Sequence, residues 1–306
     1  MKTQFDISLH FDFKEEVNGN KMFSEKRALE AFTLMKSLGI KYFNTWCNDD
    51  VYPQSDEDDI LFAKILSRRM KEMDIKMSSF HFVGSVLDCY DESQNKVRFY
   101  MERTLKIFAD CKPGSIVVHP GTYGEGGFKC NKIAHQKAVD KWGREKTHAM
   151  LIENLRHFGK LAAKYDIKIA VENLFQGRFY SNVEELIGLV EGVALDNVGY
   201  CLDSGHANLD HVDIPETIRR MGSKLFEVHL HDNNGKEDQH LPIGFGNLEW
   251  ISIIRALKDI GYQGTATYEF FRWPYVDRVV GIKNSIMFWE SLEKIQENGY
   301  FTSDWK

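Results

Sequence analysis

The chain has 306 residues, of which 43% are hydrophobic and 27% charged, and its formal net charge at pH 7 is −6. This acidic balance disfavours a nucleic-acid partner, because a surface that binds a polyphosphate backbone is normally basic. No run of about 18 apolar residues occurs and the first residues carry no apolar signal core, so we expect no membrane span and a cytoplasmic location.

Short runs rich in β-branched and aromatic residues alternate with longer segments of helical periodicity. In chain order the predicted strands are Asp6–Phe11, Lys41–Cys47, Lys76–Val83, Ser115–Pro120, Lys168–Leu174, Val198–Asp203, Phe226–His231 and Thr265–Phe271. The predicted helices that follow them are Glu25–Leu38, Asp58–Met73, Gln94–Asp110, His135–Tyr165, Val183–Val190, Pro215–Met221, Leu248–Ile260 and Val279–Ile295. Histidines within the helical stretches, His135 among them, are interpreted as ordinary surface residues.

This alternation is typical of a parallel sheet with helices outside it, and the number of repeats favours a closed (β/α)8 TIM barrel of the α/β class. We expect residues 1–306 to form a single domain, since no linker or change in composition divides the chain. Two irregular loops, Gly121–Lys129 and Asp232–Leu248, follow strands on the face where barrel enzymes carry their chemistry.

Charged and polar residues at the ends of apolar strands are the most informative feature. Glu172, Asp203, His229 and Glu269 end four consecutive predicted strands, and in a barrel these ends lie side by side. Three carboxylates in a small volume repel one another unless a cation neutralises them. Mixed oxygen and nitrogen ligands suit Mn, Mg, Co, Fe or Zn, so we predict a divalent metal ion held by these four residues.

Further candidate ligands lie at other strand ends and in the loop after the seventh strand. His81, His119, His206, Asp238 and His240 are candidates for additional metal sites. His10 and His231 are weaker candidates, although His231 shares a strand face with His229 and could replace it as a ligand.

Several motifs together resemble the xylose isomerase-like TIM barrels, a superfamily that includes sugar-phosphate isomerases and epimerases, tagatose-type 3-epimerases, inosose dehydratases and endonuclease IV. They are Val-His119-Pro-Gly, Val-Glu172-Asn, Leu-Asp203-Ser-Gly-His206, His229-Leu-His-Asp232-Asn, Gly244-x-Gly246 and Tyr-Glu269-Phe, and they span nearly the whole chain. For the 3-epimerase-like members, the resemblance implies one metal ion on Glu172, Asp203, His229 and Glu269, with the two glutamates moving protons and His206 contacting substrate. For endonuclease IV, it implies up to three zinc ions, and all nine matching positions are occupied here.

The sequence therefore predicts a metal-dependent isomerase or epimerase of a sugar or sugar phosphate, with Glu172 and Glu269 as the catalytic residues. A metal-dependent phosphoester hydrolase with several zinc ions and a polyol (inosose-type) dehydratase are the alternatives, and a non-catalytic sugar-binding barrel is a further one. One metal ion is expected, with up to three left open, and a homo-oligomer is also left open. Substrate contacts are predicted for His206, His119, His231, Lys236 and Arg272.

Overall fold

Eight parallel strands close into one barrel, which confirms the predicted TIM-barrel fold. The structure is a computed structural model that describes residues 6–17, 20–46, 56–82, 85–123, 132–175, 177–178, 180–270 and 277–298. The first strand pairs with both the second and the last strand of the barrel, and these pairings close the ring. Around the ring the strands are β1 (Ile7–Phe11), β4 (Tyr42–Trp46), β5 (Lys76–Phe82), β7 (Ser115–Val118), β9 (Lys168–Glu172), β10 (Val198–Asp203), β11 (Leu225–Leu230) and β12 (Ala266–Tyr268).

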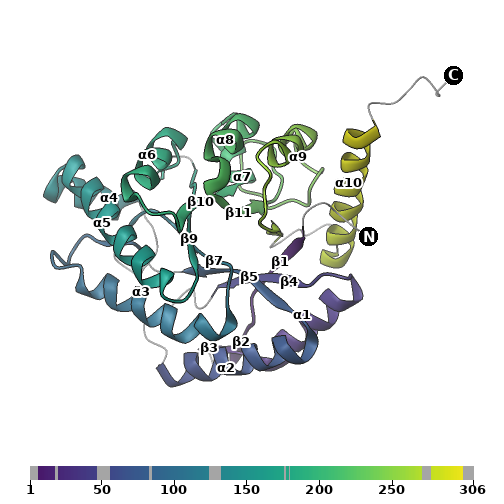
Figure 1. Ribbon diagram of the computed structural model, residues 1–306, viewed down its shortest axis with the longest axis horizontal. Coiled ribbons are helices and arrows are strands. Elements are labelled where there is room, and N and C mark those ends of the chain that lie inside the picture. Colours follow the sequence, from purple (N-terminus) through teal and green to yellow (C-terminus); the bar gives the residue numbers. More distant parts are fainter. Residues whose placement is uncertain are drawn as a thin grey trace.

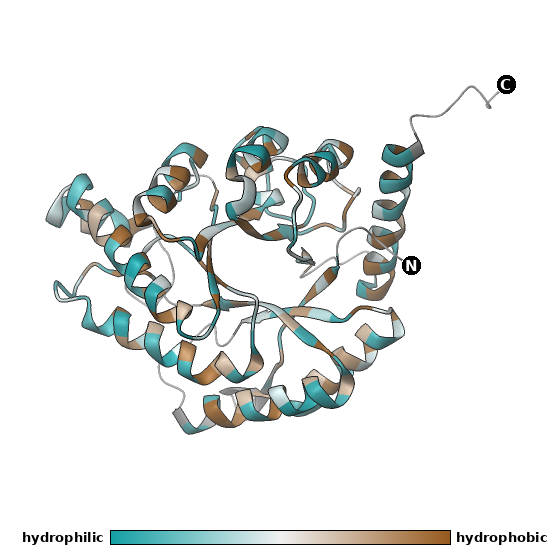
Figure 2. Ribbon diagram, viewed as in Figure 1, coloured by the Kyte–Doolittle hydropathy of each residue, from teal (hydrophilic) through white to brown (hydrophobic). Residues whose placement is uncertain are grey.

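Helices cover the outside of the barrel (Figure 1), and apolar and polar residues alternate along them with helical spacing (Figure 2). In the first helix Ala28, Phe32 and Met35 are buried on one face, and Ser24 caps the helix by accepting a hydrogen bond from the Arg27 backbone N–H at 3.3 Å. The helices are α1 (Glu25–Ser37), α2 (Asp56–Met73), α3 (Asn95–Phe108), α4 (Lys132–Trp142), α5 (Arg144–Ala163), α6 (Val183–Val193), α7 (Ser204–Leu209), α8 (Ile214–Met221), α9 (Trp250–Asp259) and α10 (Arg278–Asn298). None of the described helices combines the length and apolar character needed to cross a membrane.

The segment predicted as one helix over His135–Tyr165 is two helices, α4 and α5, which meet at Gly143. Gly143 has a φ of +82°, a left-handed conformation that side chains disfavour, so the chain turns there. The sequence-based prediction was therefore wrong at this point, because the helical periodicity continues on both sides of the turn.

Some short elements were not predicted. They are the antiparallel hairpin of β2 (Lys14–Val17) and β3 (Asn20–Phe23), the parallel pair of β6 (Leu87–Asp88) and β8 (Thr122–Tyr123), and α7. Each is too short to show a period in the sequence.

The hydrophobic core lies between the helices and the barrel wall, whereas part of the barrel interior is polar. Phe80 of β5 stacks on Phe108 of α3 with ring centroids 4.2 Å apart, which joins wall and helix. Inside the barrel, Asn44 donates a hydrogen bond to Ser79 Oγ at 2.6 Å, and Thr267 donates one to Glu227. The interior therefore carries hydrogen-bonded polar groups below the strand ends that hold the candidate ligands.

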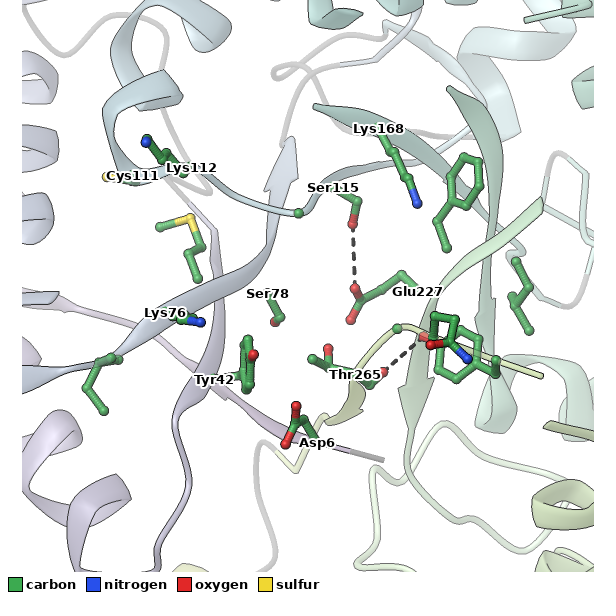
Figure 3. Close-up of a pocket in the computed structure, with 18 of the residues that line it drawn as sticks. Asp6, Tyr42, Lys76, Ser78, Cys111, Lys112, Ser115, Lys168, Glu227 and Thr265 are labelled. Carbon is green, nitrogen blue, oxygen red and sulfur yellow. Dashed lines mark hydrogen bonds between the residues drawn. The ribbon is translucent and has the colours of Figure 1, made fainter. Parts of the chain in front are cut away.

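A cavity of about 800 Å³ opens at the opposite, N-terminal ends of the strands. Figure 3 shows Ser78, Ser115 and Glu227 directed into it, with Lys76 and Lys168 near its rim. Burial raises the pKa of Glu227 to about 7. Despite its volume, this cavity lies away from all the predicted ligands, and barrel enzymes carry their chemistry at the other end. The candidate site is therefore at the carboxyl ends of the strands.

Candidate metal centre at the carboxyl end of the barrel

The four predicted metal ligands come from four neighbouring strands of the barrel. Glu172 ends β9, Asp203 ends β10, His229 lies in β11, and Glu269 directly follows β12. Asp203 and His229 are paired in the register of β10 and β11, and all four residues are buried. Four buried titratable groups on adjacent strands need a shared partner, because isolated charges are costly to bury.

We call Glu172, Asp203, His229 and Glu269 the quartet. The imidazole of His229 lies close to both of its glutamates. Its Nδ1 lies 3.3 Å from Glu172 Oε1 and 3.3 Å from Glu269 Oε1. Potential ligand atoms of Asp203, His229 and Glu269 all lie within 4.8 Å of one another. The structure thus brings the four residues together as the sequence predicts.

The second carboxylate oxygen of Glu172 faces another pair of predicted residues. Glu172 Oε2 lies 3.0 Å from His81 Nε2 and 3.1 Å from His119 Nε2. The two imidazole rings meet edge to face with centroids 4.7 Å apart. Glu172 can therefore bridge the quartet and this histidine pair through its two oxygens.

A further group of four forms beside the quartet from α7, the end of β11 and the loop after it. We call His206, His231, Asp238 and His240 the second group. Asp238 Oδ2 lies 3.3 Å from His240 Nε2 and 3.8 Å from His206 Nε2. His206 and His240 have their other ring nitrogens held by the backbone oxygens of Asn173 and Glu269, at 2.9 and 2.8 Å. These bonds orient both imidazoles toward Asp238.

The surroundings act in opposite directions on the two glutamates of the quartet. Burial favours the neutral form of Glu172, but attraction to His229 and His119 outweighs burial and holds the pKa of Glu172 well below its usual range. For Glu269, burial raises the pKa, and the nearby charges of Glu172 and Asp203 add to the increase although His229 opposes it. Two carboxyl groups with divergent pKa values suit proton transfer in both directions.

The histidines respond to the same excess of negative charge. Burial opposes protonation of His206, yet Asp203, Asp238 and Glu172 together raise the pKa of this residue to about 10. Burial opposes protonation of His229 as well, but the hydrogen bond to Cys201 and the carboxylates of Glu269 and Glu172 raise the pKa of His229 well above its usual range. The cluster therefore favours bound positive charge.

A divalent cation fits the quartet. Glu269 Oε1 is buried and accepts no hydrogen bond from the described residues. The 3.3 Å separations at His229 Nδ1 match the spacing of about 3.4 Å between neighbouring ligand atoms around a tetrahedral ion with bonds of ~2.1 Å. Carboxylate oxygen with imidazole nitrogen is also the ligand type of Mn, Fe, Co and Zn sites.

The other predicted substrate contacts, Lys236, Arg272 and His231, differ in their positions relative to the quartet. Lys236 is exposed in the loop after β11, and its backbone N–H donates to Asn234 Oδ1 at 2.9 Å. Arg272 lies outside the described residues. His231 is fully buried, with its ring against Asp203 and His240. His10, a weaker candidate, lies 3.7 Å from Glu269 Oε1 and 2.6 Å from Asn44 Oδ1.

Sequence reasoning missed two residues that hold the site in place. Asn173 accepts a hydrogen bond from the Asp203 backbone N–H at 2.7 Å and donates one to the Asp203 backbone oxygen at 3.1 Å, which ties β9 to β10. Asp232 accepts hydrogen bonds from Gly244 N and Trp250 Nε1 at 3.1 and 2.8 Å, which hold the loop after β11. Both lie within the quoted motifs, directly after Glu172 and His231, and this adjacency is the signal that could have identified their role.

Parts of the sequence are similar to known proteins. The chain is 31% identical over 178 residues to an uncharacterized protein of Methanocaldococcus jannaschii, covering 55% of this chain and 58% of that protein. It is 28% identical over 194 residues to the D-psicose 3-epimerase of Enterocloster bolteae, covering 63% of this chain and 60% of that enzyme. The matches thus span less than two thirds of the length of these relatives.

The fold itself is shared over almost the whole chain. A crystal structure of a D-tagatose 3-epimerase-like protein superposes with a TM-score of 0.68 at 23% identity, covering 96% of this chain and 99% of that one. The model of the xylose isomerase-like TIM barrel family matches residues 32–292. The chain belongs to the xylose isomerase-like TIM barrel family.

Proposed function

We propose that the chain is a cation-dependent epimerase or isomerase of a sugar or sugar phosphate, in which Glu172 and Glu269 move the proton. The observation that carries this proposal is the approach of both carboxylates to the same nitrogen, Nδ1 of His229, at 3.3 Å each. Two carboxylates at one cation position are the groups that an enolising reaction needs next to an activated carbonyl. The similarity to a D-psicose 3-epimerase supports a sugar as the substrate.

Glu172, Asp203, His229 and Glu269 would hold the cation. When bound, a divalent cation supplies a Lewis acid that draws electron density from a carbonyl and a neighbouring hydroxyl group. The chain's own residues do the proton chemistry. Glu172, which His229 and His119 favour as a carboxylate, accepts the proton of the carbon next to the carbonyl. Glu269, whose neutral form burial favours, returns a proton to that carbon, and the roles exchange in the reverse reaction.

The substrate's oxygens need donors besides the cation. His206 is held by Asn173 O and is the member of the second group that lies beside Asp203 of the quartet, so we propose that it orients a substrate hydroxyl. The loop Asn233–Leu241 contains Lys236 and no arginine, so a sugar that reaches this loop would meet a single cationic side chain of Lys or Arg type. Together with His119, these residues form the proposed substrate contacts.

Hydrogen exchange at carbon tests this mechanism directly. The protein with Mn²⁺ is incubated with ketopentoses, ketohexoses and their phosphates in D₂O, and the proton signal of the carbon next to the carbonyl is followed by NMR. We expect exchange with the wild type and a decrease of at least about 100-fold in Glu172→Gln and in Glu269→Gln, because each removes one proton carrier.

Glu184→Gln is the matched control, since Glu184 is an exposed residue of α6 paired with Arg220. Its exchange rate should equal that of the wild type. Exchange that persists at the wild-type rate in either the Glu172→Gln or the Glu269→Gln variant would contradict the two-glutamate mechanism. Loss of water from an inosose in the same assay, without exchange on the sugars, would instead support the dehydratase alternative.

The full set of nine ligand positions favours one further candidate function, hydrolysis of a phosphoester. His81 and His119 with Glu172, and His206 with Asp238 and His240, form two additional groups whose ligand atoms lie within 4.8 Å of one another. Several cations side by side suit attack of water on phosphorus. Elemental analysis of the purified protein separates the two functions: one ion per chain supports the epimerase, and two or three zinc ions with cleavage of abasic-site DNA would support the hydrolase.

A further inference from the structure

His231 belongs to the second group and faces two carboxylates, Asp203 of the quartet and Asp238 of its own group. Its Nε2 is 3.0 Å from Asp203 Oδ1 and 3.9 Å from Asp238 Oδ1. Its ring stacks on the ring of His240 with centroids 3.8 Å apart and planes 15° apart. The imidazole is 0% exposed. The carboxylate of Asp203, also buried, is the nearer of its two ionic partners.

The surrounding backbone allows the His231 ring little freedom. Ser204 Oγ donates to the His231 backbone oxygen at 2.9 Å and accepts from its N–H at 3.2 Å. A Cβ at Gly205 would lie 1.9 Å from His231 Cε1, so the first turn of α7 must have glycine here for the ring to fit. Packing against α7 and His240 therefore restricts the position of the His231 ring relative to Asp203.

The hydrogen bonds also determine which ring nitrogen carries the proton in the neutral imidazole. Nε2 must donate in order to bond Asp203, while Nδ1 is buried with no hydrogen-bond partner among the described residues. The Asp203 carboxylate already accepts the His206 backbone N–H at Oδ1, at 2.7 Å. Two donors from different elements therefore fix the orientation of this carboxylate toward the quartet.

We infer that His231 is a positioning residue, which holds the Asp203 carboxylate for cation binding through Nε2–H and connects it to Asp238 and His240. This inference rests on the proposed cation centre. Hydrogen-bond partners of metal ligands commonly contribute 10–100-fold, as an order of magnitude, to metal affinity. The role is distinct from ligation, because His231 would fix a ligand of the quartet without entering it.

Two substitutions separate the hydrogen bond from the volume of the side chain. A glutamine amide can place an N–H where Nε2 lies, whereas an asparagine amide reaches only as far as Nδ1. Mn²⁺ affinity of the EDTA-treated protein is measured by electron paramagnetic resonance of free Mn²⁺. We expect His231→Asn to bind the first equivalent about 10–100-fold more weakly than the wild type and His231→Gln to stay within about threefold.

The outcomes distinguish this inference from the proposed function. Wild-type affinity in H231N, or equal losses in H231N and H231Q, would overturn the positioning role. A wild type that binds no Mn²⁺, Co²⁺ or Zn²⁺ would instead overturn the cation centre. If H231N fails to fold by circular dichroism, ¹⁵N NMR of the wild-type histidine rings decides, with H231Q identifying the signal: a neutral Nε2–H form supports the inference, and a neutral Nδ1–H form overturns it.

Discussion

At the residue scale, His135 shows how burial changes the pKa of a side chain that the sequence suggests is ordinary. It lies on α4, is partly buried, and burial together with the charge of Arg144 lowers its pKa from 6.5 to about 4. Between these two pH values the unfolded chain binds a proton that the folded chain does not. The contribution of the neutral His135 to the free energy of unfolding is therefore fully present above about pH 6.5, and it is lost as the pH falls toward 4.

We expect His135→Gln to reduce this acid sensitivity. Each pKa unit corresponds to about 1.4 kcal/mol, and partial exposure reduces the total to roughly 1–2 kcal/mol. Urea unfolding of both proteins at pH 7 and pH 4.5 measures the difference in their pH dependence. Parallel changes in the free energy of unfolding would show that His135 titrates normally in the folded state.

Single residues also show which parts of the site can be predicted from sequence. Glu172 and Asp203 could be identified because a charged residue after a buried strand contradicts the pattern around it. Glu227, which lies in the cavity at the opposite end of the barrel, could not be identified as a buried polar residue, because its neighbours in the sequence do not reveal the hydroxyl groups of Thr267 and Ser115 that surround it. Side chains across the barrel become neighbours only after closure.

At the element scale, the loop after β11 depends on one buried carboxylate. Asp232 is 0% exposed and accepts four hydrogen bonds, from Asn233 N, Gly244 N, Leu248 N and Trp250 Nε1, at 2.8–3.3 Å. A Cβ at Gly246 would lie 2.1 Å from Asp232 Oδ1, so the loop also packs closely on this group. The same loop carries Asp238 and His240 of the second group.

Asp232→Asn should therefore destabilise the loop. The amide turns a donor toward N–H groups that then lack an acceptor, and two buried unsatisfied groups cost about 2–4 kcal/mol. Urea unfolding measures the decrease in the free energy of unfolding, with the exposed Glu237→Gln in the same loop as the control. An unchanged midpoint in Asp232→Asn would show that water or a shift of the loop replaces the carboxylate.

Elements were predictable where they are long and periodic. All eight barrel strands were predicted, because each is a short apolar run between polar segments. The division of α4 from α5 was missed because Gly143 was not recognised as a turn, and α7 was missed because it begins directly after β10 with Asp203 as its N-cap. A residue that is both a candidate ligand and a helix cap gives two signals at one position, and only the chemical one was recognised.

At the scale of the whole molecule, barrel closure determines the site, because it places the ends of β9, β10, β11 and β12 side by side. The buried carboxylates of Glu172, Asp203 and Glu269 then lie at one point, and their mutual repulsion opposes folding unless positive charge balances it. Protonated histidines supply that charge without a cation, as the raised pKa values of His206 and His229 indicate. The alternation of strands and helices in the sequence predicts that the carboxylates converge. It does not predict how far the histidines balance their negative charge.

A cation that binds only the folded barrel should therefore raise its thermal stability. At a concentration 100 times its Kd, such a ligand stabilises by about 2.7 kcal/mol, and a chain of this size gains about 2–4 °C per kcal/mol, so Tm should rise by roughly 5–10 °C. Thermal unfolding of the EDTA-treated protein with and without Mn²⁺, Mg²⁺, Co²⁺, Fe²⁺ or Zn²⁺ measures the shift. Asp203→Asn should reduce it, because this substitution removes one anionic ligand, while the exposed Glu184→Gln should retain it. An equal Tm with and without every one of these ions would mean that the histidines alone balance the carboxylates, and that the quartet is an ion-pair network rather than a metal centre.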